Sequence, residues 1–262
     1  MSLFRFQVPV RALFRRPILA AQCIAARNKD VKSRHFASSA ADVDHKLYEY
    51  RVYSIKPDQL AAFVKLTNEQ IHMRLSHSKL IGYWMSDLGG MNEVCHIWEY
   101  DNFAQRTAVR AALGADKVWQ QKYFQHILKM MTKQENAVLK AIPSIPLQTE
   151  PRKEGGIYEL RQYTMKPVGP GVFLPPFLEL LESRVKLHEQ LNYGKLMGAW
   201  VTDIGNVNNV YHLWNYESLD KRTEGRHVVL GSDELKNMPI TSMPVVTMTT
   251  KIMLPLPFSP LK

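Results

Sequence analysis

Apolar and polar positions alternate along residues 46–57, which is the period of a β-strand. KLYEYRVYSI (46–55) is rich in Tyr, Val and Ile, and Pro57 ends the pattern because proline donates no ladder hydrogen bond. The spacing then becomes helical, which predicts a helix from a capping Asp58 to about His77. Its apolar positions are Leu60, Phe63, Val64, Ile71 and Leu75.

Two more alternating stretches and a second helical pattern complete this unit. LIGYWMSDL (80–88) and EVCHIWEY (93–100) predict strands joined by a GGMN turn. Asn102 is the expected cap of a long helix that runs to about Met131, and ENAVLKAI (135–142) predicts the last strand. The order βαββαβ is that of a ferredoxin-like unit.

The same unit recurs later in the chain. NEVCHIWEYDNFAQRTAVR (92–110) matches NNVYHLWNYESLDKRTEGR (208–226), and YEYRVYSIKP (48–57) matches YELRQYTMKP (158–167). The offset grows from 110 to 116 residues, so the second copy carries six extra residues, which we place in VGPGVFLPP as a loop before a helix. A repeat of about a hundred residues is domain-sized. We therefore predict a first ferredoxin-like domain (46–143), a linker (144–156) and a second domain (157–262).

The end of the second copy is less regular than that of the first. Ser232 predicts a helix start, but Pro239 must end or break that helix. VVTMTTKIML (245–254) predicts the final strand.

Both faces of the predicted sheet carry large apolar residues. In EVCHIWEY, His96 and Trp98 point to one face, and Cys95 and Ile97 point to the other. Helices of one unit cover one face, so a second sheet has to cover the other. We therefore expect an α+β fold in which the tandem duplication forms a dimeric α/β-barrel-type pseudo-dimer, with the helices outside. The tryptophans assigned to the barrel core are Trp84, Trp98, Trp200 and Trp214.

The basic charge of the chain is concentrated at its N-terminus. Residues 1–36 hold eight Lys or Arg against Asp30, a net charge of +7, which leaves +3 of the total +10 for the remainder. The charge therefore does not indicate nucleic-acid binding. An Arg-rich, acid-poor stretch with Ser and Ala is typical of a mitochondrial transit peptide, and RHFASSA (34–40) predicts a cut after Phe36.

A secretory signal peptide and a membrane anchor are the alternatives for this region. PILAAQCIAA (17–26) has the apolar character of a signal peptide, but four basic residues follow it before Phe36. No apolar run approaches the ~20 residues of a membrane-spanning helix, so no stable membrane insertion is expected. Removal of Cys23 would leave Cys95 alone, which excludes an intrachain disulfide and a cysteine metal cluster in the mature chain.

Long motifs in both copies resemble one known family. The motifs that carry the similarity are YEYRVYSIKP, GYWMSDLGGMNEVCHIWEYDNFAQRTAVRAAL (82–113), LMGAWVTDIGNVNNVYHLWNYESLDKRTEGR (196–226) and the ending PFSPLK. The chain is similar to the NipSnap family over nearly all of residues 46–262. The ending is like that of the shorter members of the family. The resemblance implies a dimeric α+β barrel, mitochondrial residence and protein partners. Members are linked to vesicular transport, and the longer ones to tagging damaged mitochondria through autophagy adaptors.

Two pairs of histidines recur at an offset of 116 residues: His72 with His188, and His96 with His212. A neutral imidazole can ligate haem iron or another metal, or act as a base, and barrels of this architecture include oxygenases and haem enzymes. That analogy rests on fold alone. The simpler interpretation is a satisfied core histidine beside tryptophan, and no Glu/His spacing completes a metal set. We predict no metal and no cofactor.

Charged residues recur as well. Arg51 and Arg161 each follow a glutamate and precede a tyrosine on one strand face, which predicts either a polar pocket for an anionic ligand inside the barrel or a structural Glu–Arg pair. Arginines one helical turn apart could grip an anion at a helix start, or pair with Asp101, Glu99 or Glu217. These arginines are Arg106 with Arg110 and Arg222 with Arg226.

No nucleotide-binding, nucleophile or metalloprotease motif is present, and no catalytic residue is assigned. The favoured interpretation is a non-enzymatic mitochondrial protein that acts through protein–protein interaction in mitophagy, mitochondrial quality control or vesicular transport. The alternative is a small-molecule or haem-binding barrel, with oxygenases as one class, centred on His96, His212, Arg51 and Arg161. A cavity in the lumen would favour it, and a lumen packed with Trp and Tyr would argue against it. Either the duplication replaces a dimer interface, or two chains still associate as a homo-oligomer.

Overall fold

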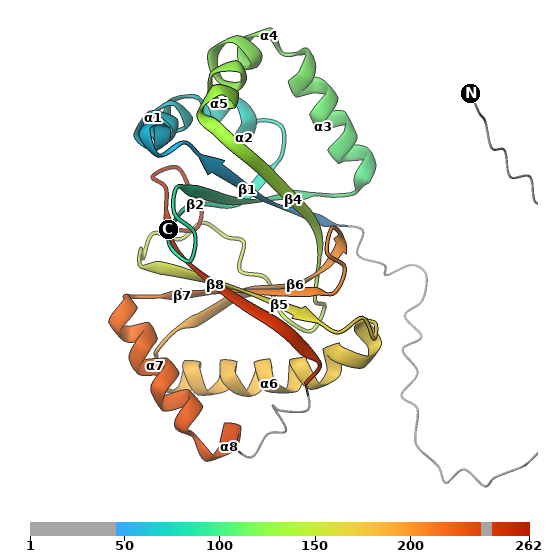
Figure 1. Ribbon diagram of the computed structural model, residues 1–262, viewed down its shortest axis with the longest axis vertical. Helices are drawn as coiled ribbons and strands as arrows, with labels where there is room; N and C mark the ends of the chain where they lie inside the picture. The colour runs from blue at the N-terminus through green and yellow to red at the C-terminus, as the bar shows by residue number, and fades with distance from the viewer. Residues whose placement is uncertain (1–45, 237–242) are drawn as a thin grey trace, which may run out of the picture. The chain divides into compact units, whose positions relative to one another are not determined.

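The computed structural model describes residues 46–236 and 243–262 (Figure 1). The expected transit peptide, with its cut after Phe36, lies outside this part of the chain, and so does Pro239. None of the helices in the described part is long and apolar enough to cross a membrane.

The first repeat has the predicted βαββαβ order. Its strands are β1 (Leu47–Ile55), β2 (Lys79–Leu88), β3 (Glu93–Tyr100) and β4 (Met131–Ala141). The helices between β1 and β2 are η1 (Pro57–Gln59), α1 (Leu60–Gln70) and α2 (His72–Leu75). Those between β3 and β4 are α3 (Phe103–Ala115), α4 (Lys117–Trp119), the π-helical turn η2 (Gln120–Phe124) and α5 (Gln125–Met130).

Both helical segments of this repeat are broken where the sequence predicted continuous helices. Asp58 does not cap the first helix, because it lies within the 3₁₀ turn η1. The second segment begins as expected, since the Asn102 Oδ1 accepts a hydrogen bond from the Gln105 N–H at 2.9 Å. Asp116 then adopts an extended conformation and caps α4 with its Oδ1, which accepts from the N–H groups of Val118 and Trp119.

The second repeat has the same order with a different first helix. Its elements are β5 (Ile157–Met165), α6 (Pro170–Gln190), β6 (Lys195–Ile204), β7 (Asn209–Tyr216), α7 (Leu219–Gly231), α8 (Asp233–Lys236) and β8 (Val245–Pro255). The prediction that VGPGVFLPP forms a loop was wrong for most of its length, because α6 begins at Pro170. Proline is favoured in the first helical turn, where its missing N–H has no intrahelical partner to bond.

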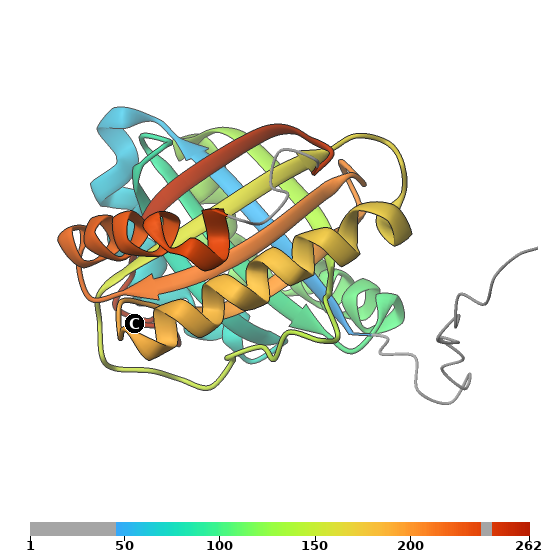
Figure 2. The ribbon, with the colours of Figure 1, turned by 90° about the horizontal axis from the view of Figure 1, so that it is seen from below.

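The eight strands close into one barrel in the order β1-β3-β2-β8-β5-β7-β6-β4. All neighbours are antiparallel, and the repeats meet where β2 pairs with β8 and β4 pairs with β6. The helices of the first repeat cover one side of the barrel, and α6 and α7 cover the opposite side (Figures 1 and 2). The predicted α+β fold, two ferredoxin-like units joined in a dimeric α/β-barrel-like arrangement, is confirmed.

Three apolar cores hold this barrel together. Side chains from both repeats pack in the lumen, among them Tyr48, Tyr50, Trp84, Tyr158, Trp200 and Tyr211. The other two cores lie between each half of the sheet and its own helices. Trp84 and Trp200 are therefore lumen residues as predicted, whereas Trp98 and Trp214 lie on the outer face of the sheet beneath helices.

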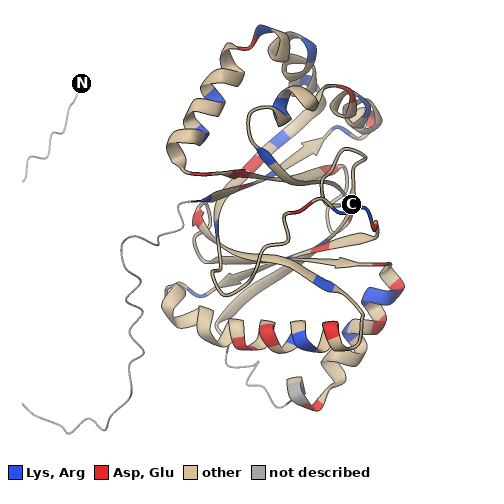
Figure 3. Cartoon of the chain, turned by 180° about the vertical axis from the view of Figure 1, so that it is seen from behind, with Lys and Arg blue, Asp and Glu red and all other residues tan. Residues whose placement is uncertain are grey.

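The outer faces of the helices are charged. Both acidic and basic residues occur along α6 and α7 (Figure 3). This is typical of amphipathic helices that turn their apolar stripe towards a sheet. The chemically distinctive groups lie between the sheet and the helices.

Candidate functional site

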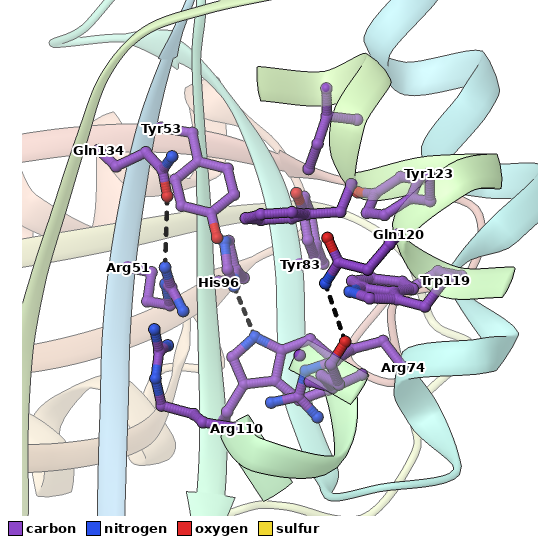
Figure 4. A pocket seen from close by; sticks show the side chains of 16 residues that line it. Arg51, Tyr53, Arg74, Tyr83, His96, Arg110, Trp119, Gln120, Tyr123 and Gln134 are labelled. Carbon is purple, nitrogen blue, oxygen red and sulfur yellow. Dashed lines mark hydrogen bonds between the residues drawn. The ribbon is translucent and has the colours of Figure 1, made fainter. Parts of the chain in front are cut away.

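A cavity of about 230 Å³ lies between the sheet and the helices of the first repeat (Figure 4). Its volume equals that of about eight waters, at ~30 Å³ each. Arginine, amide, imidazole and aromatic side chains form most of its wall: Arg51, Arg74, Arg110, Gln120, Gln134, His96, Tyr53, Tyr83, Trp98, Trp119, Tyr123 and Phe124. The cavity is outside the barrel lumen, so the prediction of a polar pocket inside the barrel was wrong in its location.

Three neighbouring strands contribute side chains to the sheet side of this cavity. Arg51 of β1 is paired with His96 of β3, and His96 is paired with Tyr83 of β2. Side chains at paired positions of neighbouring strands point to the same face of a sheet. The three groups therefore lie side by side beneath α2, α3 and η2. The π-helical turn supplies Gln120, Tyr123 and Phe124 to the wall, and such turns often occur at functional sites.

His96 is enclosed by three aromatic side chains. Its ring stacks on Tyr83 at 4.5 Å between centroids and meets the edge of Tyr53 at 4.7 Å. The indole Nε1 of Trp98 donates a hydrogen bond to the His96 Nδ1 at 2.6 Å. Burial, together with the charges of Arg51 and Arg74, lowers the pKa of His96 well below its usual value, so the ring is neutral.

The hydrogen bond from Trp98 also determines the tautomer of His96. Because Nδ1 accepts, the single ring proton of the neutral imidazole is on Nε2. This Nε2 is buried and has no hydrogen-bond partner among the described residues. His96 therefore presents an unused donor at the cavity, while a ligand to iron would need an unprotonated nitrogen.

The three arginines of the wall are held in different ways. Arg74 lies 3.9 Å over the Trp98 ring and donates to Ser78 Oγ at 2.6 Å and to the Tyr100 hydroxyl at 2.7 Å. Arg51 donates to Gln134 Oε1 at 3.4 Å, and its Nη1 lies 3.9 Å from Glu49 Oε1, which is the predicted structural Glu–Arg pair. The Nε of Arg51 is buried without a partner among the described residues. Arg110 is exposed, which places it at the entrance.

The glutamate of this strand face has a structural role. Glu49 is fully buried and accepts two hydrogen bonds from Arg106, at 2.9 and 3.0 Å, and one from Asn136 at 2.8 Å. Burial alone would raise the pKa of Glu49, but the bonds from Arg106 and Asn136 and the charge of Arg51 hold it below its usual value. The partner of Arg106 is thus Glu49, rather than Asp101 or Glu99 as predicted.

The second repeat reproduces part of this arrangement. Trp214 Nε1 donates to His212 Nδ1 at 2.6 Å, and His212 lies near Tyr163 and Phe177. Burial, with the charge of Arg161, lowers the pKa of His212 well below its usual value. His212 and Arg161 belong to β7 and β5, so they are not brought to the cavity that contains His96 and Arg51.

The predicted equivalence of His72 and His188 was wrong. His72 is exposed on α2, and its Nδ1 is 3.0 Å from the Glu69 carbonyl oxygen. His188 is fully buried with its ring 4.8 Å from Trp214, which is the place that Arg74 takes beside Trp98. The first helices therefore align at an offset of 114 residues rather than 116, because α6 has no break that matches the one at Ile71.

Sequence reasoning missed several cavity residues. Arg74 follows Phe63, Thr67 and Ile71 at spacings of four, four and three, which are those of one helix face. An arginine on an otherwise buried stripe was a signal that could have been used. Tyr123 lies on a predicted apolar stripe with Trp119 and Ile127, and all three are buried, whereas Gln120 gave no such signal.

The described residues contain no group of three or more His, Cys, Asp or Glu side chains arranged to hold a metal ion. Cys95, the free cysteine in this part of the chain, is buried and accepts a hydrogen bond from the Tyr50 hydroxyl at 3.5 Å. The cavity is thus a site of donors and aromatic surfaces.

Comparison with known proteins gives the same fold and a family. The NIPSNAP family model matches residues 48–146 and again 158–260. Human NipSnap homolog 3A is 38% identical over 235 residues, which is 87% of this chain and 90% of that protein, and human NipSnap homolog 3B is 37% identical over the same shares. A candidate monooxygenase from Fusobacterium nucleatum shares the fold at 11% identity, with a TM-score of 0.59 over 82% of this chain and 94% of that one. With both repeats matched and relatives aligned over most of their length, the chain belongs to the NIPSNAP family.

Proposed function

We propose that the cavity of the first repeat binds a small organic anion with a planar or apolar body. The observation that carries this proposal is the Nε2–H donor of His96, which is buried beside three arginines without an acceptor among the described residues. No carboxylate is among the residues that line the cavity. A carboxylate or phosphate would satisfy the donors, and Trp98, Trp119 and Tyr83 would contact the rest of the molecule.

The wall of the cavity supports binding rather than acid–base catalysis. The Nδ1 of His96 is occupied by Trp98, so it is not free to accept a proton from a ligand. Burial raises the pKa of Tyr53, Tyr83 and Tyr123, and phenols with a raised pKa are donors at neutral pH. We therefore propose a binding protein, not an enzyme.

Benzoate is a suitable first probe because it combines a carboxylate with a planar ring. Saturable quenching of tryptophan fluorescence is expected, since Trp98 and Trp119 line the cavity. Arg110→Gln removes a charge at the entrance and should weaken binding by roughly tenfold, the loss expected for one charged hydrogen bond. Lys122→Gln removes a charge from the adjacent η2 outside the cavity wall and should leave binding unchanged.

To identify the natural ligand, the chain lacking residues 1–36 is purified from its own mitochondria. Native mass spectrometry and an absorption spectrum of this protein are then recorded. A bound small molecule that is lost in Arg110→Gln would support the proposal. A ligand-free mass together with no saturable quenching by benzoate would overturn it. A haem absorption band would instead favour an iron-binding function.

We also propose that the protein resides in mitochondria and acts there through protein partners, autophagy adaptors among them. This proposal rests on the Arg-rich, acid-poor residues 1–36 and on the NipSnap resemblance. Subcellular fractionation and N-terminal sequencing should find a mature chain that begins at Ala37. Co-purification from cells with depolarised mitochondria tests the partners, and recovery of the chain without any adaptor would count against that part.

A further inference from the structure

Among the described residues, the second repeat buries two arginines and the first repeat one. Arg161 of β5 and Arg184 of α6 are 3% and 6% exposed. Neither forms an ion pair with a described residue, and the Arg161 Nε and Nη1 and the Arg184 Nε are buried without hydrogen-bond partners there. The polar contact that Arg161 makes is with the sulfur of Met248, at 3.2 Å from its Nη2. Buried guanidinium groups are normally paired, so these two require an explanation.

The nearby carboxylate cannot balance every arginine of this region. Glu159 is fully buried, and its Oε1 lies 2.5 Å from Arg222 Nη2 and 3.6 Å from Arg226 Nη1. Its single negative charge is therefore shared by the two arginines of α7, and its Oε2 is buried without a hydrogen-bond partner among the described residues. Among the described residues beneath α6 and α7, no second fully buried carboxylate remains for Arg161 and Arg184.

The charge on this cluster persists at neutral pH. Burial, with the charges of Arg184 and Arg226, lowers the pKa of Arg161 to about 10, so the guanidinium is protonated at pH 7. Burial and the same arginines lower the pKa of His188 to about 4, which leaves its ring neutral with one N–H donor. Both ring nitrogens of His188 are buried without partners among the described residues.

We propose that Arg161, Arg184 and His188 form a second binding site, for a small oxyanion, between β5 and α6. The helix and the strand run along the same side of the barrel (Figure 2), and the charges of Arg161 and Arg184 act on one another and on His188. An oxyanion would accept from the unused guanidinium and imidazole donors and would supply the missing negative charge. The site is separate from the cavity of the first repeat, whose walls contain residues 51–134 alone.

The proposed site differs in its residues from the corresponding position of the first repeat. At the helix offset of 114 residues, Arg184 takes the place of Gln70, and His188 takes the place of Arg74. Arg74 is satisfied by Ser78 and Tyr100 within the fold, whereas the groups of the second repeat have no such partners among the described residues. The second site should therefore take a smaller and more highly charged ligand than the first.

Inorganic phosphate is the probe for this site. The melting temperature of the chain lacking residues 1–36 should rise saturably with phosphate, compared with chloride at equal ionic strength. Arg184→Gln should abolish this rise, and without phosphate it should melt no lower than the wild type because a buried unpaired charge is removed. Arg184→Lys keeps the charge but loses the planar donors, so it should weaken phosphate binding about tenfold or more by isothermal titration calorimetry.

Arg110→Gln separates the two sites. It should reduce benzoate binding in the first repeat and keep the phosphate-dependent rise in melting temperature. The two proposed sites can therefore be tested independently of each other. An unchanged phosphate response in both Arg184 variants would overturn the second site. The same conclusion would follow if Arg184→Gln melted lower without phosphate and kept the full rise, because Arg184 would then be structural. If Arg184→Gln does not fold, calorimetry of Arg184→Lys decides.

Discussion

Single residues of this protein owe their chemistry to a neighbour on the same strand. His96 and His212 each accept from a tryptophan two positions later, at the same 2.6 Å distance. Burial and arginine charge hold each ring neutral, and this contact fixes its proton on Nε2. His188 has no such partner among the described residues, yet it is equally buried. The three rings differ in hydrogen bonding, but burial lowers the pKa of each, so each makes the stability depend on pH in the same direction.

At the residue scale we expect stability to fall as the pH drops from 6.5 to 5. The pKa of His188 is lowered to about 4, and those of His96 and His212 are lowered well below the usual value, by burial first and arginine charge second. The unfolded chain therefore takes up protons near pH 6.5 that the folded chain does not, so the free energy of unfolding is highest above that pH. The loss should reach roughly 2 kcal/mol for each histidine at pH 5.

Urea denaturation between pH 5 and 7 checks this expectation. His188→Phe should remove about a third of the pH dependence, because it removes one of the three buried rings. The exposed His72→Gln is the matched control and should give the wild-type curve. A stability that does not change between pH 7 and 5 would show that these histidines are protonated in the folded chain.

Among the elements, β2 and β6 each use a glycine to make room for a tryptophan in the lumen. Each has a register irregularity that ends at a glycine, Gly82 or Gly198, two positions before a lumen tryptophan. A Cβ on Gly82 would overlap the indole of Trp84, and one on Gly198 would lie 2.7 Å from the Trp200 ring. Both indoles are almost fully buried and cannot move aside. The glycines therefore leave space for the two largest side chains of the lumen.

At the element scale, Gly82→Ala should lower the free energy of unfolding by about 1–3 kcal/mol, the usual cost of overpacking a core. Gly114→Ala in α3 adds the same methyl group where nothing lies within 4 Å. That control should be neutral or stabilising by up to about 1 kcal/mol, because alanine favours a helix over glycine. Equal effects of the two substitutions in chemical denaturation would contradict the packing argument.

For the whole molecule, closure of the barrel makes the two repeats interdependent. β4 of the first repeat pairs with β6 of the second, and β8 of the second pairs with β2 of the first. The lumen core takes residues from both repeats. The C-terminal tail adds to this, since Ser259 Oγ accepts from the Tyr83 N–H at 2.9 Å, and Leu261 is fully buried. Neither repeat can bury its inner sheet face alone.

At this scale we predict that a fragment of residues 37–150 does not persist as a folded monomer. It would expose the apolar lumen face and two strand edges, so it should dimerise or aggregate. Co-expression with residues 151–262 should restore a one-to-one complex, which size-exclusion chromatography and native mass spectrometry can identify. A monomeric fragment that unfolds cooperatively would be the contrary result.

Much of the fold could be predicted because the alternation of residues within each strand matches the face on which each side chain lies in the structure. Val94, Trp98 and Tyr100 do face the helices, and Cys95 and Ile97 do face the lumen, as alternation requires. The helices were harder to predict, since both predicted helices are broken, one of them at Asp116, whose side chain caps the following helix α4. The site was predicted in part: Arg51 and His96 lie together at the cavity, while Arg74 and Tyr123 join them through helix positions that no short motif marks.

The chain's repeats, its strand alternation and the large apolar residues on both faces of each strand already require two sheets packed against each other, because one unit cannot cover both faces with its own helices. The location of the chemistry does not follow from these patterns. Alternation places Arg51 on one face of β1 and His96 on one face of β3, but closure of the barrel makes these faces the outer one, beneath the helices. The same closure fills the lumen with Trp84, Trp200 and tyrosines. Which arginines remain unpaired depends on contacts between residues far apart in sequence, such as Glu159 with Arg222, and the folded chain alone brings these together.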